Sequence, residues 1–136
     1  MKTVSMMALV ATFLASGNLY ADGAHDGAKV TPLMQQPLAD YPGKEGLMVT
    51  VEFAPGHVDA AHRHPGHVFV YVLEGTIEMQ VEGGELRTLR RGDTFYENPK
   101  DIHPVGRNVS DTQPAKLLVF FVKDQGAPPV LPPAPH

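Results

Sequence analysis

Apolar and polar residues alternate along two segments of the chain, 47–53 and 76–82. A two-residue period is typical of a strand with one face in the core and the other in solvent. Two further segments, 68–73 and 117–122, are continuous apolar runs of strand length, as expected for strands that are covered on both faces. Since a sustained helical period does not occur between these segments, the pattern predicts an all-β domain.

Turn-forming residues separate the predicted strands. Proline, glycine and aspartate gather at Pro55-Gly56, Pro65-Gly66, Glu74-Gly75, Gly83-Gly84, Arg91-Gly92-Asp93 and residues 99–101. Many short strands at this spacing predict a sandwich or a barrel, which we assign to residues 47–123.

The two ends of the chain do not share this pattern. Residues 1–21 combine a positively charged start with an uncharged apolar run and a small residue at the expected cleavage point, which predicts a signal peptide. Residues 22–46 lack any period and predict an extended N-terminal arm. Residues 124–136 are rich in proline and predict a polyproline-like or disordered tail, with partner recognition as an alternative role.

Export is therefore the expected fate of the chain. After signal removal we expect a single secreted domain, not inserted in a membrane, and the bacterial periplasm as its compartment. The sequence of 136 residues has no cysteine, which excludes disulfides, zinc–thiolate sites and a cysteine nucleophile. The formal net charge is −4 and Arg90-Arg91 is the only adjacent basic pair, so we do not expect nucleic acid as a partner.

Histidines are concentrated just before the central apolar segment. His57, His62, His64 and His67 fall within eleven residues. In an extended segment, residues two apart point to the same face, so His62 and His64 can aim both imidazoles at one point while Arg63 points away. This geometry suits two ligands of one metal ion, although a bare His-x-His pair is common by chance.

Two motifs around these histidines resemble the cupin superfamily. Gly56 stands six residues before His62, another glycine follows eleven residues after His64, and His103 follows Gly92 by eleven residues across a proline turn. The stretch 62–75 looks especially like that of the small quercetin-dioxygenase-like monocupins, with a type 2 cupin domain. The resemblance implies a double-stranded β-helix, that is, a jelly-roll barrel. It also implies one divalent transition metal ion (Fe, Mn, Ni, Cu or Zn) held by His62, His64 and His103.

One ligand of the family motif is missing. The metal-binding glutamate of the family would stand at position 68 or 69, where this chain has Val and Phe. Glu97 is one candidate for the fourth ligand or for a catalytic acid or base, because it shares strand parity with Phe95 and precedes His103 across a turn. His67, after the Pro-Gly turn, is the other candidate for a ligand or proton carrier. For Glu97 the alternative is a solvated carboxylate at a strand end, and for His67 it is a residue at the barrel rim. His57 is expected to be exposed in its loop.

Three functions are compatible with the sequence, and the resemblance implies the first of them. The first is a metal-dependent, dioxygenase-like oxidoreductase that acts on a small organic molecule, with aromatic molecules among the candidates. Glu97 or His67 would accept a proton from the substrate. The barrel would supply an apolar pocket with Tyr71, Phe69, Phe95 and Met79 as lining candidates. The second is a non-catalytic periplasmic protein that binds metal or a small ligand, which the missing glutamate favours. The third is a structural cupin without metal. Family resemblance also implies a homodimer.

Overall fold

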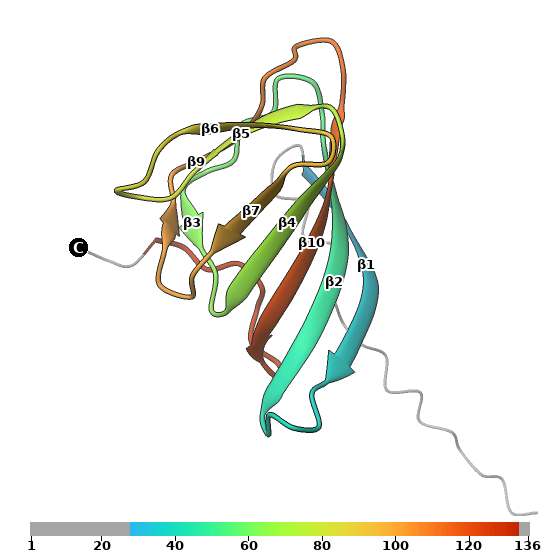
Figure 1. Ribbon diagram of the computed structural model, residues 1–136, viewed down its shortest axis with the longest axis vertical. Helices are drawn as coiled ribbons and strands as arrows, with labels where there is room; N and C mark the ends of the chain where they lie inside the picture. Colours follow the sequence, from blue (N-terminus) through green and yellow to red (C-terminus); the bar gives the residue numbers. More distant parts are fainter. Residues whose placement is uncertain (1–27, 134–136) are drawn as a thin grey trace, which may run out of the picture.

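The computed structural model describes residues 28–133, and the expected signal peptide lies outside these described residues. Every regular element in this range is a strand (Figure 1). No helix among the described residues is long and apolar enough to cross a membrane. The strands are β1 (Ala28–Pro37), β2 (Lys44–Phe53), β3 (His62–Arg63), β4 (His67–Glu74), β5 (Thr76–Gln80), β6 (Arg87–Arg90), β7 (Thr94–Glu97), β8 (Ile102–His103), β9 (Val105–Asn108) and β10 (Ala115–Asp124).

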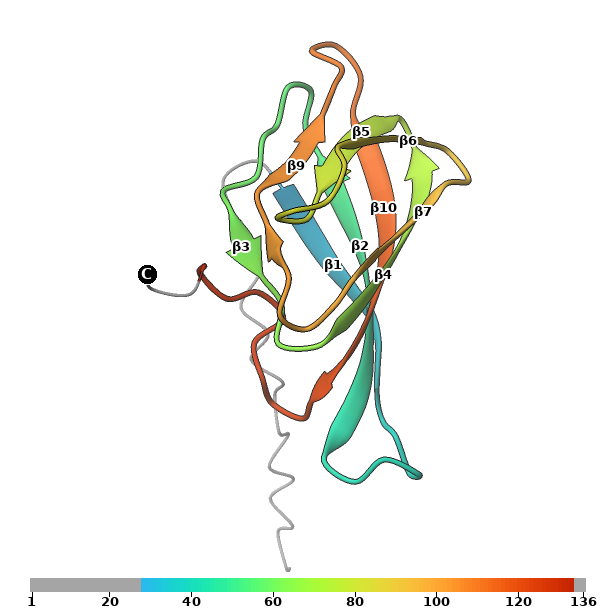
Figure 2. The same cartoon turned by 60° about the vertical axis from the view of Figure 1, so that its left-hand side comes forward.

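The strands form one large sheet faced by two smaller ones. The large sheet has the order β1-β2-β10-β4-β7, the second sheet has the order β6-β5-β9, and β3 pairs with β8. All the pairings are antiparallel. Figures 1 and 2 show the large sheet as a twisted wall with the short strands β3, β5, β6 and β9 opposite it. The predicted all-β jelly-roll fold is confirmed.

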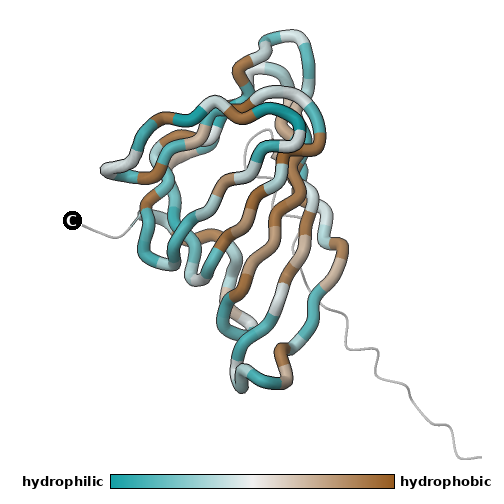
Figure 3. The backbone as a smooth tube through the Cα atoms, viewed as in Figure 1, coloured by the Kyte–Doolittle hydropathy of each residue, from teal (hydrophilic) through white to brown (hydrophobic). Residues whose placement is uncertain are grey.

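The core lies between the sheets and is filled from alternating positions of the strands. Figure 3 shows apolar residues along the central strands of the large sheet. The predicted alternation in segments 47–53 and 76–82 is confirmed, with Leu47, Val49, Ile77 and Met79 all at most 4% exposed. The remaining buried core residues are Ala28, Phe53, Val68, Val70, Val72, Leu89, Phe95, Ala115, Leu117, Val119 and Phe121.

Of the two continuous apolar runs, the one in β4 is covered on one face only, whereas the outward side chains of the run in β10 are half-buried. In β4 the side chains of Val68, Val70 and Val72 are buried, whereas Phe69 is 49% and Tyr71 is 44% exposed on the outer face of the sheet. Successive side chains of a strand point to opposite faces, so both sets cannot face the core. The expectation that Phe69 and Tyr71 line the barrel interior is therefore wrong.

The described part of the segment expected to be an extended N-terminal arm contributes a strand to the sheet. Strand β1 pairs with β2 from Ala28 opposite Phe53 to Pro37 opposite Glu45. Its register shifts between Pro32 and Met34, and β1 is the edge strand of its sheet. Proline lacks a backbone N–H, and an edge strand tolerates it where that N–H would face solvent, because no hydrogen bond between strands is then lost. The same proline obscures the two-residue period in the sequence.

Candidate metal centre

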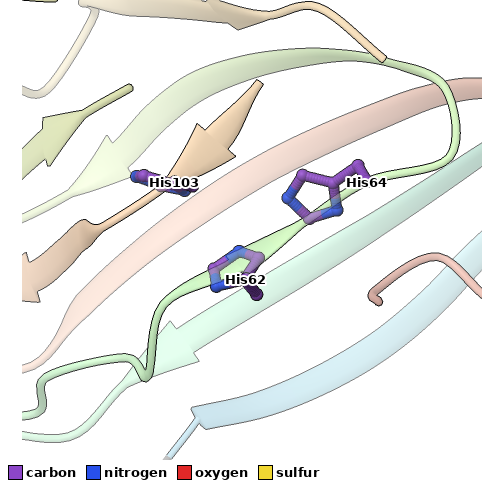
Figure 4. A group of neighbouring side chains, drawn as sticks. All are labelled: His62, His64 and His103. Carbon is purple, nitrogen blue, oxygen red and sulfur yellow. The ribbon is translucent and has the colours of Figure 1, made fainter. Parts of the chain in front are cut away.

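Three histidines from two neighbouring short strands converge inside the barrel. His62 lies on β3 and His103 on β8, where they are direct cross-strand partners, and His64 follows one residue after β3. One ring nitrogen from each histidine lies within 4.8 Å of those of the other two. Figure 4 shows His62 and His64 on one segment with His103 on the strand beside it. The expected convergence of these imidazoles is present.

Backbone carbonyls hold the rings of His62 and His64 in defined tautomers. Nδ1 of His62 lies 2.8 Å from the carbonyl oxygen of Ala60, and Nδ1 of His64 lies 2.7 Å from that of Pro129. A carbonyl oxygen can only accept, so each Nδ1 carries the proton and donates it. The Nε2 atom of each neutral ring then keeps its lone pair for a metal ion, as is usual for histidine ligands.

Burial keeps two of these imidazoles neutral. His64 is 6% and His103 is 2% exposed. Burial, reinforced by the neighbouring histidines, lowers the pKa of His103 to about 3; burial is also the main cause that lowers the pKa of His64 to about 4. Both rings are therefore neutral at pH 7, which is the form that binds metal.

Glu97 adds a buried carboxyl group to the cluster. It is 1% exposed, its Oε1 lies 3.3 Å from Nδ1 of His103, and its Oε2 lies 3.4 Å from Nε2 of His64. It faces inward like Phe95, as the strand parity predicts. Burial, with smaller contributions from the charges of Asp101 and Asp59, raises the pKa of Glu97 to about 8. In the metal-free protein the acid form of Glu97 therefore dominates at neutral pH.

The cluster leaves polar atoms that the protein itself does not satisfy. Among the described residues, the buried side-chain atoms without a hydrogen-bond partner are Oε2 of Glu97 and both ring nitrogens of His103. An unsatisfied buried polar group costs about 1–3 kcal/mol. All three atoms belong to the same cluster. A single cation bound there would satisfy Oε2 of Glu97 and one ring nitrogen of His103, whose other ring nitrogen keeps its proton. The donor set of imidazole and carboxylate suits a divalent transition metal ion.

His67 is not part of this cluster. It begins β4, is exposed, and its Nδ1 lies 2.7 Å from the hydroxyl of Tyr96 on the outer face of the large sheet. The next residue, Val68, points into the core, so the pleat of the strand turns His67 outward. Its predicted roles as fourth ligand or proton carrier are not supported, and Glu97 is the candidate that the structure brings to the histidines.

A second histidine–carboxylate pair lies near the cluster and was missed. His57, expected to be exposed, is 8% exposed, and its Nε2 lies 2.7 Å from Oδ1 of Asp59. The backbone N–H of Asp59 donates to the carbonyl of Gly106, which lies three residues after His103. The His-x-Asp spacing was the only signal in the sequence, and burial of the loop that carries it has no local signature.

Comparison with known proteins places this geometry in a family. The model of the family described as "Cupin domain" matches residues 49–121, more than half of the chain. "Oryzines biosynthesis cluster protein J" of Aspergillus oryzae is 38% identical over 87 residues, which are 63% of this chain and 46% of that protein. "Pectin degradation protein KdgF" of Dickeya dadantii is 37% identical over 60 residues, which are 43% of this chain and 54% of that protein. The chain thus spans about half the length of the curated relatives it matches.

Solved structures show the same fold. A recombinant oxalate oxidase in complex with glycolate is 26% identical with a TM-score of 0.60, over 84% of this chain and 64% of that one. The DMSP lyase DddQ from Ruegeria pomeroyi is 26% identical with a TM-score of 0.56, over 63% of this chain and 42% of that one. An RmlC-like cupin from Shewanella frigidimarina, 22% identical with a TM-score of 0.58 over 74% of this chain and 79% of that one, shares the fold. The chain belongs to the cupin domain family.

Proposed function

We propose that the protein is a metal-dependent enzyme that acts on a small organic substrate. The observation that carries the proposal is the convergence of His62, His64 and His103 on one point, with the buried carboxyl group of Glu97 beside them. Three histidines and one carboxyl group could hold one divalent Fe, Mn, Ni, Cu or Zn ion, which when bound would polarise a substrate oxygen. A six-coordinate ion would keep positions open for substrate.

Glu97 is proposed to move the proton that the reaction requires. Because its pKa is raised to about 8, the carboxyl group can carry a proton near pH 7 and can give it up when positive charge approaches. Its oxygens lie 3.3 Å and 3.4 Å from ring nitrogens of His103 and His64, in a site from which water is largely excluded. This combination is common among catalytic acids and bases, and it supports turnover over passive binding.

Dioxygenase chemistry is the first reaction to test. The resemblance to quercetin-dioxygenase-like monocupins and the structural likeness to oxalate oxidase both support oxygen-dependent chemistry on small molecules. The metal-free protein should be loaded with Fe(II), Mn(II), Ni(II), Cu(II) or Zn(II) in turn and assayed for oxygen uptake with flavonols, diketones, oxalate and glycolate. We expect uptake that requires both one metal and one substrate. Absence of uptake in every combination would contradict the dioxygenase proposal.

The second candidate is a binding protein without turnover. It is favoured by the position of Glu97, because a fourth protein ligand leaves fewer open positions for chemistry at the ion. In that case the same small molecules should stay bound through desalting and be recovered unchanged by mass spectrometry. Recovery of a modified product would exclude this candidate.

We further propose that two copies of the chain pair through the outer face of the large sheet. Phe69, Tyr71 and Tyr96 are 49%, 44% and 42% exposed there, and a groove of about 500 Å³ runs between them and the half-buried Phe120. Contiguous exposed apolar surface of this kind marks interaction sites. The apolar runs in the sequence predict cover on both faces, which a second copy would provide.

A positive charge introduced on this outer face should prevent the two copies from forming a dimer. We expect Phe69→Lys to convert a dimer to a monomer in size-exclusion chromatography with light scattering, because an ammonium group cannot be buried unpaired in an apolar interface. Val58→Lys is the matched control, since Val58 is 63% exposed and pairs with Arg107 on β9, in the sheet that faces the large one. A wild-type protein that is monomeric at all concentrations would contradict the pairing.

A further inference from the structure

The proline-rich segment that follows β10 is bound to the strand that carries the histidines. The backbone N–H of Arg63 donates to the carbonyl of Leu131 at 3.0 Å, and the N–H of Leu131 donates to the carbonyl of Arg63 at 2.8 Å. Nε of Arg63 also donates to the carbonyl of Pro132 at 3.1 Å. Figure 2 shows the chain turning back after β10 toward β3. The described part of the tail that was expected to be polyproline-like or disordered is therefore docked on β3, and we define residues 127–133 as the strap.

The end of β10 fixes where this strap leaves the sheet. Lys123 is 1% exposed and forms an ion pair with the buried carboxylate of Glu45 on β2. The N–H of Gln125 donates to the carbonyl of Gly43 at 2.9 Å, and Gly126 has a φ of +76°, which turns the chain back. These contacts turn the strap back toward β3, the strand that carries His62.

The strap reaches the histidine cluster at one atom. The carbonyl of Pro129 accepts the Nδ1–H of His64 at 2.7 Å, across 65 residues of sequence. The ring of His64 packs on Phe121, with centroids 5.4 Å apart, and its Nε2 faces Glu97. His62, in contrast, takes its carbonyl partner from Ala60 in its own loop. Of the three cluster histidines, His64 alone has a hydrogen-bond partner from a distant described segment.

Proline suits this position for two reasons. Its ring restricts φ, so the strap loses less conformational entropy on docking than a flexible segment would. Pro128, Pro129 and Pro132 also have no N–H groups, so none of them leaves a donor to be satisfied at the barrel mouth. Beyond the N–H of Ala127, which donates to the carbonyl of Asp124, the hydrogen bonds found for the strap in the described range join it to Arg63 and His64.

We propose that the strap positions His64, so that strap docking and metal binding are coupled. Pro129 is a positioning residue that acts through His64, and the inference rests on the proposed metal site. Because coupling between two equilibria is reciprocal, an undocked strap weakens metal binding and bound metal tightens the strap. The ligand is the same divalent transition metal ion as in the proposed function. Its affinity depends on docking of the C-terminal strap.

Leu131→Pro tests this coupling in the full chain. The substitution removes the N–H that donates to Arg63, whereas Leu131→Ala keeps it and serves as the matched control. We expect Leu131→Pro to weaken Zn(II) or Mn(II) affinity by about 10–100-fold, the usual effect of losing a partner that orients a ligand. Leu131→Ala should bind within about twofold of wild type. Affinity is measured by competition with a chelator, so turnover is not required.

Two further measurements keep the test decisive. In the wild-type chain, metal binding should increase hydrogen-exchange protection of the amides of Arg63 and Leu131. Pro129→Gly, which keeps the carbonyl but loosens the strap, should weaken metal affinity by less than Leu131→Pro does. Equal metal affinity in Leu131→Pro and Leu131→Ala, or unchanged amide protection, would overturn the coupling.

Failure of the strap can be told from failure of the metal site. Nitrogen NMR of the metal-free wild-type protein should show His64 as its Nδ1–H tautomer, and Leu131→Pro should lose this preference while Leu131→Ala keeps it. If the wild-type chain binds no metal but this tautomer difference is seen, the proposed function fails while the positioning role stands. If metal binds normally and the tautomer is the same in both variants, the strap has no positioning role.

Discussion

We expect His103→Ala to reduce bound transition metal to background while the chain still folds. His103 supplies one of three ring nitrogens that lie within 4.8 Å of one another, and neither of its ring nitrogens has a hydrogen-bond partner within residues 28–133. Losing a direct ligand should weaken affinity by more than the 10–100-fold that follows loss of an outer partner. The fold should tolerate the change, because it also removes two unsatisfied buried polar atoms.

Metal content per chain after loading and desalting is the measurement, with thermal unfolding of the metal-free proteins as the check on folding. His67→Ala is the matched control, since His67 lies on the outer face and should leave metal content unchanged. His62→Ala is a second variant at a half-buried position with less risk to the core. Full metal content in His103→Ala would refute the site, and background content in the wild type would favour the structural cupin.

Much of the fold could be predicted because the strands of one domain must bury one face. The alternation around Val49 and Met79 identified core positions correctly, because a side-chain period of two fixes which residues share a face. Strand β1 could not be found in this way. It pairs along only one edge and contains Pro32 and a register shift, so its sequence carries no clear period.

The site was predicted as far as local geometry reaches. The His-x-His spacing brought His62 and His64 together, and the parity of Glu97 with Phe95 placed the carboxyl group inside the barrel. His67 was misjudged because the turn before it resets which face the next strand presents.

Contacts between segments that lie far apart in the chain could not be predicted from the sequence. The hydrogen bond from His64 to Pro129 joins residues 65 positions apart, and neither segment has a period that signals the other. Composition alone predicts disorder for a proline-rich end. The docking site for that end exists only once β3 and β10 are in place.

Glu97→Gln should reduce the number of protons released when the metal ion binds. With a pKa of about 8, Glu97 is mostly protonated at pH 7, and a cation beside it favours the carboxylate. Binding of one ion at pH 7 should therefore release close to one proton from the wild type and almost none from Glu97→Gln. His64 and His103 contribute little, because their pKa values of about 4 and 3 leave them unprotonated. Calorimetry in buffers of different ionisation enthalpy measures this release; equal release from both proteins would contradict the assignment.

The same substitution should alter how the stability of the metal-free protein depends on pH. The pKa of Glu97 in the folded chain, about 8, is above its ordinary value of 4.5, so between these values the folded state keeps a proton that the unfolded state has lost. The free energy of unfolding therefore falls as pH rises. The lowered histidine pKa values act in the opposite direction below about pH 6.5. Between about pH 6.5 and 8 the wild type should lose about 2 kcal/mol, and Glu97→Gln should not.

Turnover then separates the two proposed functions. If Glu97 carries the substrate proton, Glu97→Gln should lower kcat by about 10²–10⁴-fold, because glutamine has the same shape but cannot exchange a proton. If Glu97 serves only as a ligand, the variant should lose metal affinity, and kcat at saturating metal should stay close to that of the wild type. Proton release without any turnover would identify an ionised carboxylate that completes the metal centre, and the protein would then be a metal-binding cupin.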